Sequence, residues 1–318
     1  MDSSSIILGM ENIPPSLRRC SLAIGNFEGV HLGHQRIVQT ARILAANEKL
    51  PVVAMTFDPP PELVIRPEGP PRRITPIEEK CRLLLSAGAD HVVVASSSPQ
   101  LLGMPPKEFV ETIIVSQLAA RYVVEGRDFH FGAKRGGNIN LLGLLGCQYG
   151  FAVHVVEAVM LDFPAGPQRI SSTLIRQLVA QGNVEDARRC MSRPYTMHGL
   201  VVSGEGRGKL LDFPTVNLGP CEQIIPADGV YAGRAVIEGQ PFAAAISVGH
   251  KPTLGPSTQH YIEAFLLDTS GDFYGRAMAL SFLRRLRGQE KFADSSALKA
   301  QIAKDVEAVR AIFDAGDQ

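Results

Sequence analysis

The stretch AIGNFEGVHLGHQRIVQTA, residues 23–41, decides the fold of the first half of the chain. It opens in a short apolar run, turns through glycines, and continues in a segment whose apolar residues recur with a helical period. Two histidines, His31 and His34, fall where the helix is expected to begin. In a parallel sheet this place is the carboxyl end of a strand, where ligands bind.

The composition of this turn favours phosphate chemistry. A helix N-terminus offers free N–H groups and a partial positive charge, both of which attract phosphate. Gly25 permits the turn, Gly33 permits close approach of a phosphate, and two imidazoles can donate hydrogen bonds to charge on an attacked phosphorus. From the spacing alone, a pair of surface histidines and half a metal site stay open. The strand, turn and helix around them favour the phosphate interpretation.

Outward from this stretch, apolar runs alternate with helical patterns. This alternation predicts an α/β domain with a doubly wound parallel sheet. The expected strands are residues 21–25, 52–57, 91–96, 121–126 and 151–157.

The rhythm changes near residue 190. Strand-like runs punctuated by glycine and proline then follow one another without intervening helices, and one amphipathic helix closes the chain at about residues 296–313. This pattern predicts an antiparallel β-barrel with a terminal helix. We therefore predict two domains, residues 1–188 and 189–318.

Composition limits the function classes. The 318 residues carry 32 basic and 32 acidic side chains, so no broad electrostatic surface for nucleic acid is expected. The five cysteines are scattered and form no CxxC pair, which predicts a reducing compartment. With no signal-peptide pattern and no apolar run of membrane-spanning length, we expect a cytoplasmic protein without a membrane partner. Weak self-association stays open.

Four motifs in the first half carry a family resemblance. GNFEGVHLGH (25–34), TFDPPP (56–61), VVEGRDFHFGAKRGG (123–137) and ISSTLIR (170–176) resemble, in order, the motifs of the adenylyltransferase module of prokaryotic bifunctional riboflavin kinase/FAD synthetases. The resemblance implies Mg²⁺-dependent transfer of AMP from ATP to the phosphate of FMN, which forms FAD and releases pyrophosphate. It implies catalytic roles for His31, His34 and Arg176, and nucleotide binding by Gly25, Asn26, Phe27, Gly33, Asp128, Ser171, Ser172 and Thr173.

The second half carries a glycine-rich stretch, GEGRGKLLDFPTVNL, residues 204–218. Glycines interleaved with Arg207 and Lys209 suit a loop that wraps phosphates, although for the loop by itself a flexible hairpin is the better interpretation. FPTVN, PADGVYAG, SVGHKPTLG and YIEAFLLD together resemble riboflavin kinases. The resemblance implies phosphorylation of riboflavin by ATP.

The same resemblance assigns residues in this half. Thr215 and Asn217 correspond to ligands of Mg²⁺, and Glu263 to the general base acting on the ribityl hydroxyl. In an alternating strand Glu263 shares a face with Tyr261 and Phe265. From the residues alone, a surface salt bridge is an alternative role for Glu263. Gly206, Gly208, Lys209 and Arg287 correspond to ATP- or flavin-binding positions.

Several positions depart from the family pattern. Glu28 stands where the family usually has Asp, Pro60 where it has His, and Asp212 where it has Gly. We expect FAD synthesis to be impaired rather than absent. Three alternatives stay open: a riboflavin kinase whose first module has lost its chemistry, a non-catalytic flavin or nucleotide sensor, and a transferase acting on another acceptor.

Overall fold

The computed structural model describes residues 5–65, 68, 71–203, 213–251, 259–269 and 271–316. Contacts divide the chain into two compact units, Met1–Arg72 with Ile77–Ser171 and Arg73–Pro76 with Ser172–Gln318. The predicted ATP-binding residues Gly206, Gly208 and Lys209, and also Asp212, lie outside the described residues. Within the described residues, no helix is both long and apolar enough to cross a membrane.

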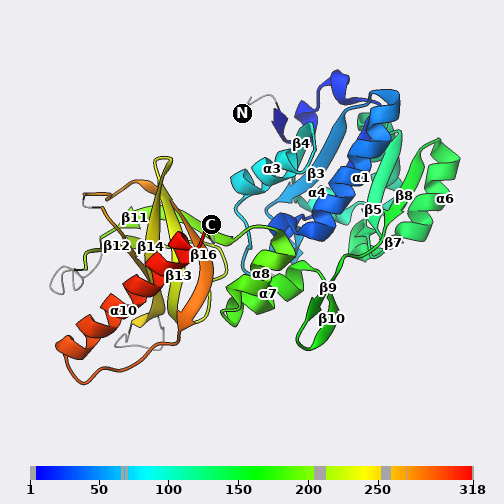
Figure 1. Ribbon diagram of the computed structural model, residues 1–318. Coiled ribbons are helices and arrows are strands. Elements are labelled where there is room, and N and C mark those ends of the chain that lie inside the picture. The colour runs from blue at the N-terminus through cyan, green and yellow to red at the C-terminus, as the bar shows by residue number, and fades with distance from the viewer. Residues whose placement is uncertain are drawn as a thin grey trace. The chain divides into compact units, whose positions relative to one another are not determined.

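The first unit is built on a parallel sheet with the strand order β1-β4-β3-β2-β5-β8 (Figure 1). From β2 the chain moves outward through β3 to β4, then returns to place β5 on the other side of β2. The winding direction therefore reverses between β2 and β5, which is where doubly wound sheets bind ligands. The strands are β1 (Ile6–Leu8), β2 (Ser21–Ile24), β3 (Val52–Asp58), β4 (His91–Ser96), β5 (Tyr122–Gly126) and β8 (Ala152–Val156).

Helices cover both faces of this sheet because its strands are apolar on both sides. Ala23 and Ala54 belong to the core cluster that includes α1 and α3, whereas Leu22 and Val53 belong to the opposite cluster with η5 and α6. The predicted doubly wound fold is thus confirmed. The helices of this unit are α1 (Leu32–Glu48), α2 (Pro61–Ile65), α3 (Ile77–Ser86), α4 (Pro99–Gly103), α5 (Pro106–Phe109), the π-helical η5 (Val110–Gln117) and α6 (Ile139–Tyr149).

Two small antiparallel hairpins complete the first unit. One pairs β6 (His130–Phe131) with β7 (Gly137–Asn138), and the other pairs β9 (Met160–Phe163) with β10 (Gly166–Arg169). The second hairpin leads directly into the ISST motif. Neither hairpin was predicted from the sequence.

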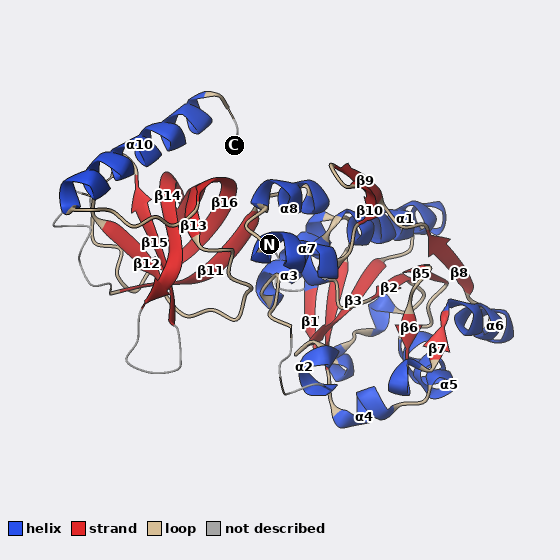
Figure 2. Ribbon diagram, turned by 90° about the horizontal axis from the view of Figure 1, so that it is seen from below, coloured by secondary structure: helices blue, strands red, loops and turns tan. Residues whose placement is uncertain are grey.

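The second unit contains a closed antiparallel barrel with the strand order β11-β12-β15-β14-β13-β16, which confirms the predicted architecture. The strands are β11 (Tyr195–Val202), β12 (Thr215–Leu218), β13 (Gly229–Ile237), β14 (Gln240–Lys251), β15 (Gln259–Leu266) and β16 (Ala277–Arg287). The closing helix α10 (Ser295–Asp314) lies along the outside of the barrel (Figure 2) and packs on β13 and β14.

Helices α7 (Ser172–Ala180) and α8 (Val184–Met191) group with the barrel, and α8 packs on β16 and β11. The predicted boundary at residues 188 and 189 lies later in the chain than this division of contacts, and it stays a prediction.

A short segment from the first half of the chain also belongs to the barrel unit. Arg73 forms a parallel bridge with Gln223, and its carbonyl accepts a hydrogen bond from Ile224 N at 2.9 Å. The buried Gln223 side chain donates to the carbonyls of Ile74 and Thr196 at 2.9 and 2.8 Å. Its Oε1 accepts from His198 N at 2.8 Å, so one amide satisfies three backbone groups.

Candidate active sites

The turn between β2 and α1 has an unusual backbone. Phe27, Gly29 and Val30 all have positive φ, at 46°, 79° and 35°. Glycine accepts this region without cost, but a β-branched valine does not, and such strain concentrates at functional sites. The carbonyl of Val30 accepts a hydrogen bond from Gln35 Nε2 at 2.9 Å, which helps to hold the turn.

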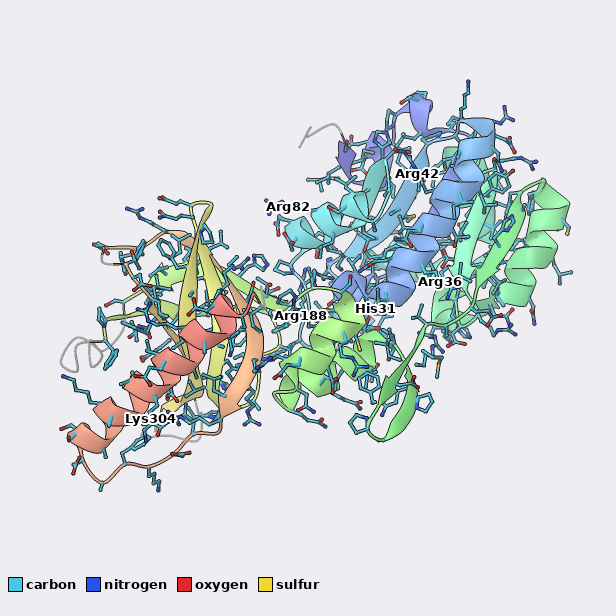
Figure 3. The ribbon with its side chains drawn as sticks, viewed as in Figure 1. His31, Arg36, Arg42, Arg82, Arg188 and Lys304 are labelled. Carbon is cyan, nitrogen blue, oxygen red and sulfur yellow. The ribbon has the colours of Figure 1, made fainter. Side chains whose placement is uncertain are left out.

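This turn delivers His31 as the N-cap of α1 (Figure 3), where its Nδ1 accepts the His34 backbone N–H at 3.4 Å. The two imidazoles are stacked, with centroids 3.6 Å apart and planes 19° apart, and Phe27 meets His34 edge-on. Because Nδ1 of His31 is an acceptor, the proton of a neutral His31 ring is assigned to Nε2, which makes Nε2 a hydrogen-bond donor. The structure thus brings the two predicted histidines together at a helix N-terminus.

Gly33 has a packing role beside the predicted one. A Cβ at this position would lie 3.1 Å from Cε1 and 3.2 Å from Nδ1 of His31. A larger residue would therefore press on the His31 ring, whereas glycine leaves the ring room on the helix cap.

A buried ion pair supports the same turn. Nζ of Lys80, on α3, lies 2.8 Å from Oε1 of Glu28, and the two side chains are 0% and 2% exposed. Glu28 is the position where the family usually has Asp, and Lys80 was not singled out from the sequence. The structure shows that the longer carboxylate at position 28 is matched by a buried cation from another element.

A second buried carboxyl lies where the sheet changes direction. Glu125, near the end of β5, accepts the Ile24 backbone N–H of β2 at 2.6 Å. β2 and β5 pair only at Ser21–Tyr122 and Leu22–Val123, so the side chain replaces the next ladder bond as the strands separate. Burial raises the pKa of Glu125 well above its usual value, against the opposing effect of the Ile24 hydrogen bond.

The other predicted nucleotide-binding residues are spread over both units. Asp128 is half-exposed and pairs with Arg169, at the end of β10. Ser171 ends the first unit, while Ser172, Thr173 and Arg176 begin α7 in the second. Pro60 is buried, and its carbonyl accepts from Leu63 N at 2.9 Å.

In the barrel, strand register places the predicted kinase residues side by side. Asn217 of β12 is directly opposite Glu263 of β15, which is in turn opposite Ser247 of β14. Thr215 is opposite Phe265 on the same face. Directly opposed residues have Cβ atoms about 5 Å apart. The structure therefore places Glu263 of β15 beside Thr215 and Asn217 of β12, which lie far from it in the sequence.

Gln289 is a neighbour that the sequence analysis missed. Its Nε2 donates to Val248 O at 2.8 Å and lies 3.1 Å from Ser247 Oγ and 3.4 Å from Tyr261 Oη. The segment that follows β16 is thereby attached to the strands β14 and β15 beside Glu263. Gln289 could have been found from the sequence, because it lies in the stretch RGQEKF together with Arg287, which was singled out.

Arg287 makes a different contact from the predicted one. Its Nε and Nη2 bind the Asp305 carboxylate of α10 at 3.0 and 2.7 Å, and this hydrogen-bonded pairing raises the pKa of Arg287. The pair is nearly buried, with 15% and 8% of the side chains exposed. Its flavin-binding role stays a prediction, and the observed contact fastens α10 to β16.

Both halves of the chain match family models. The model described as FAD synthetase covers residues 13–174, and the model described as riboflavin kinase covers residues 191–313.

Whole-chain relatives agree with these models. The chain is 33% identical over 310 residues, 97% of each chain, to the bifunctional riboflavin kinase/FMN adenylyltransferase of Escherichia coli K12. It is also 33% identical to the proteins of that name from Pseudomonas fluorescens, over 96% of this chain and 97% of the relative, and Haemophilus influenzae, over 97% and 99%.

Among solved structures, a protein described as a macrolide-efflux protein from Streptococcus pneumoniae superposes with a TM-score of 0.85 and 29% identity, over 96% of this chain and 99% of that one. The two family models, the end-to-end relatives and the two constellations of residues agree. The chain belongs to the bifunctional riboflavin kinase/FMN adenylyltransferase family.

Proposed function

We propose that this chain makes FMN from riboflavin and ATP in its barrel, and FAD from FMN and ATP in its parallel-sheet unit. The observation that carries the proposal is the row of Asn217 and Glu263 on adjacent barrel strands, in a chain that also holds the stacked His31–His34 pair. A non-catalytic sensor has no need of a carboxylate base beside neutral metal ligands.

For the kinase reaction, Glu263 accepts the proton of the ribityl hydroxyl, whose oxygen attacks the γ-phosphorus of ATP while ADP leaves. The donors fit Mg²⁺, since Thr215 and the buried Asn217 offer neutral oxygens on the face that carries Glu263. When bound, Mg²⁺ neutralises phosphate charge. Thr215 and Asn217 would hold it beside the hydroxyl that Glu263 deprotonates.

For adenylyl transfer, a phosphate oxygen of FMN attacks the α-phosphorus of ATP, and pyrophosphate leaves. FMN brings its own nucleophile, so the protein positions the groups and stabilises charge. His31 donates from Nε2, and the N-terminus of α1 adds its partial positive charge. We assign Arg176 to the phosphates of ATP as a bidentate donor.

A chromatographic product assay with MgATP, run separately on riboflavin and on FMN, tests both halves. Glu263→Gln is expected to lower FMN formation at least about 100-fold and to leave FAD formation from FMN unchanged. His31→Ala is expected to do the reverse. His198→Gln, which changes a histidine of β11 outside both sets, is the matched control.

Two outcomes would separate the alternatives. If the unaltered chain converts riboflavin to FMN but never adenylylates FMN, the chain is a kinase whose first unit has lost its chemistry, as Pro60 suggests. If Glu263→Gln still phosphorylates riboflavin at a near-normal rate, the assignment of the base is wrong.

We also propose a reducing compartment, the cytoplasm, as the place of action. The support is that all five cysteines, Cys20, Cys81, Cys147, Cys190 and Cys221, are free.

A further inference from the structure

Three metal-ligating side chains meet at one end of the barrel, outside both proposed active sites. Asp228 directly precedes β13, His250 lies near the end of β14, and His260 lies near the start of β15. We propose that Asp228, His250 and His260 form a site for one divalent transition-metal ion of the zinc class.

The ladder between β14 and β15 positions the two histidines. His250 and His260 are directly opposed, so their side chains leave the same face, and their ring centroids are 3.9 Å apart. Asp228 closes the group, with its Oδ2 2.6 Å from Nδ1 of His250. One ligand atom from each residue lies within 4.8 Å of the other two.

These separations are close to those of a coordinated ion. Ligands about 2.0–2.1 Å from a tetrahedral Zn²⁺ are about 3.3 Å from one another. The observed atoms are 4.8 Å apart or less, so rotations of the side chains bring all three onto one centre. No movement of the strands is required.

The donor set selects the kind of ion. Two imidazole nitrogens and one carboxylate suit Zn²⁺, Co²⁺ or Fe²⁺, whereas Mg²⁺ and Ca²⁺ prefer ligand sets made only of oxygen. The Asp228 and His250 side chains are 38% and 37% exposed, so an ion can enter from solvent and keep water ligands. The site therefore resembles open three-ligand zinc sites rather than closed structural ones.

This site is separate from the proposed Mg²⁺ position. Residues 260 and 263 of a strand lie on opposite faces, because successive side chains alternate. Glu263 belongs to the face of Tyr261, while His260 continues the face of the buried Ile262 and Ala264. The two ions would share no ligand.

Titration of full-length, chelator-treated protein with Co²⁺ tests the proposal, because protein-bound Co²⁺ absorbs in the visible. The titration is run in a Cys147→Ser background, since Cys147 is an exposed thiol that would compete. We expect a saturable signal at one ion per chain, displaced by Zn²⁺ and unchanged by millimolar Mg²⁺. Asp228→Asn, His250→Gln and His260→Gln should each lower the affinity at least tenfold, and His198→Gln should not.

The alternative is a group that holds no metal, in which Asp228 is hydrogen-bonded to His250 and the His260 ring is tilted against the His250 ring. A titration of the Cys147→Ser chain that gives no saturable signal, or a signal that survives both His250→Gln and His260→Gln, would overturn the proposal.

Discussion

The Lys80–Glu28 pair offers the sharpest test of how the first unit holds its catalytic turn. Lys80→Met removes the ammonium but keeps an unbranched chain of similar length. The Glu28 carboxylate, only 2% exposed, then loses the cation 2.8 Å away. Loss of one partner of a buried ion pair costs about 3–5 kcal/mol, because the buried charge that remains loses the attraction of its neighbour. Against a typical domain stability of about 5–15 kcal/mol, this is a large fraction.

The consequence should appear in one activity before the other. Glu28 lies in η4 (Glu28–Val30), directly before His31, so its displacement disturbs the histidine cap. We expect Lys80→Met to impair FAD formation from FMN and to spare FMN formation, whose residues lie in the barrel unit. The double variant Glu28→Gln/Lys80→Met should recover most of the stability that Lys80→Met loses, because neither member of the pair then carries a charge.

Unfolding in urea measures both effects. The chain has no tryptophan, so the transition is followed by circular dichroism. Both activities are measured along the same urea series, so that the loss of each reports on its own unit. A cost below about 1 kcal/mol for Lys80→Met, or a double variant no more stable than the single one, would refute the buried-pair argument.

Three further predictions concern other buried polar groups. Burial raises the pKa of Glu125 above its usual 4.5, so the folded chain keeps a proton that the unfolded chain releases. The stability that this group contributes is therefore full below pH 4.5, and it falls as the pH rises toward the folded-state pKa. The slope is up to about 1.4 kcal/mol per pH unit, and Glu125→Gln should abolish it in urea denaturation between about pH 5 and pH 7; an unchanged slope would contradict the assignment. Asp305→Asn should destabilise the attachment of α10 by about 2–3 kcal/mol, because Arg287 loses a bidentate carboxylate, and limited proteolysis should release the helix faster than in the wild type. Gln223→Leu should cost the barrel about 2–4 kcal/mol, since three backbone groups lose their hydrogen bonds to the Gln223 amide. A change in melting temperature indistinguishable from that of an exposed Gln→Leu control would argue against this.

The departures from the family pattern have unequal structural meaning. Glu28 is compensated by a buried lysine on α3. At Pro60 the imidazole of the family is absent, and the described contact of this residue is its backbone carbonyl with Leu63. Of the two, we therefore expect Pro60 to have the larger effect on FAD formation.

Local patterns in the sequence determined most of the architecture. Apolar runs of five to seven residues became β2, β3, β4, β5 and β8, and the expected closing helix begins within a residue of the observed Ser295. The cap at His31 was also predictable, because a turn followed by a helical period fixes which residue begins the helix. The three-residue β1 and the hairpin of β9 and β10 were missed, since so few residues carry no usable period.

Partners far apart in the chain were decided only by the tertiary structure. No spacing links Glu28 to Lys80, Arg287 to Asp305, or Asp228 to His250 and His260. Each pairing depends on which strands are neighbours, on their register, and on which helix covers them. Burial is likewise a property of the packed molecule, so the raised pKa of Glu125 has no counterpart in the apolar run around it. The sequence by itself thus determined the elements and the two sets of chemical groups, whereas packing decided which charges are compensated and which side chains meet.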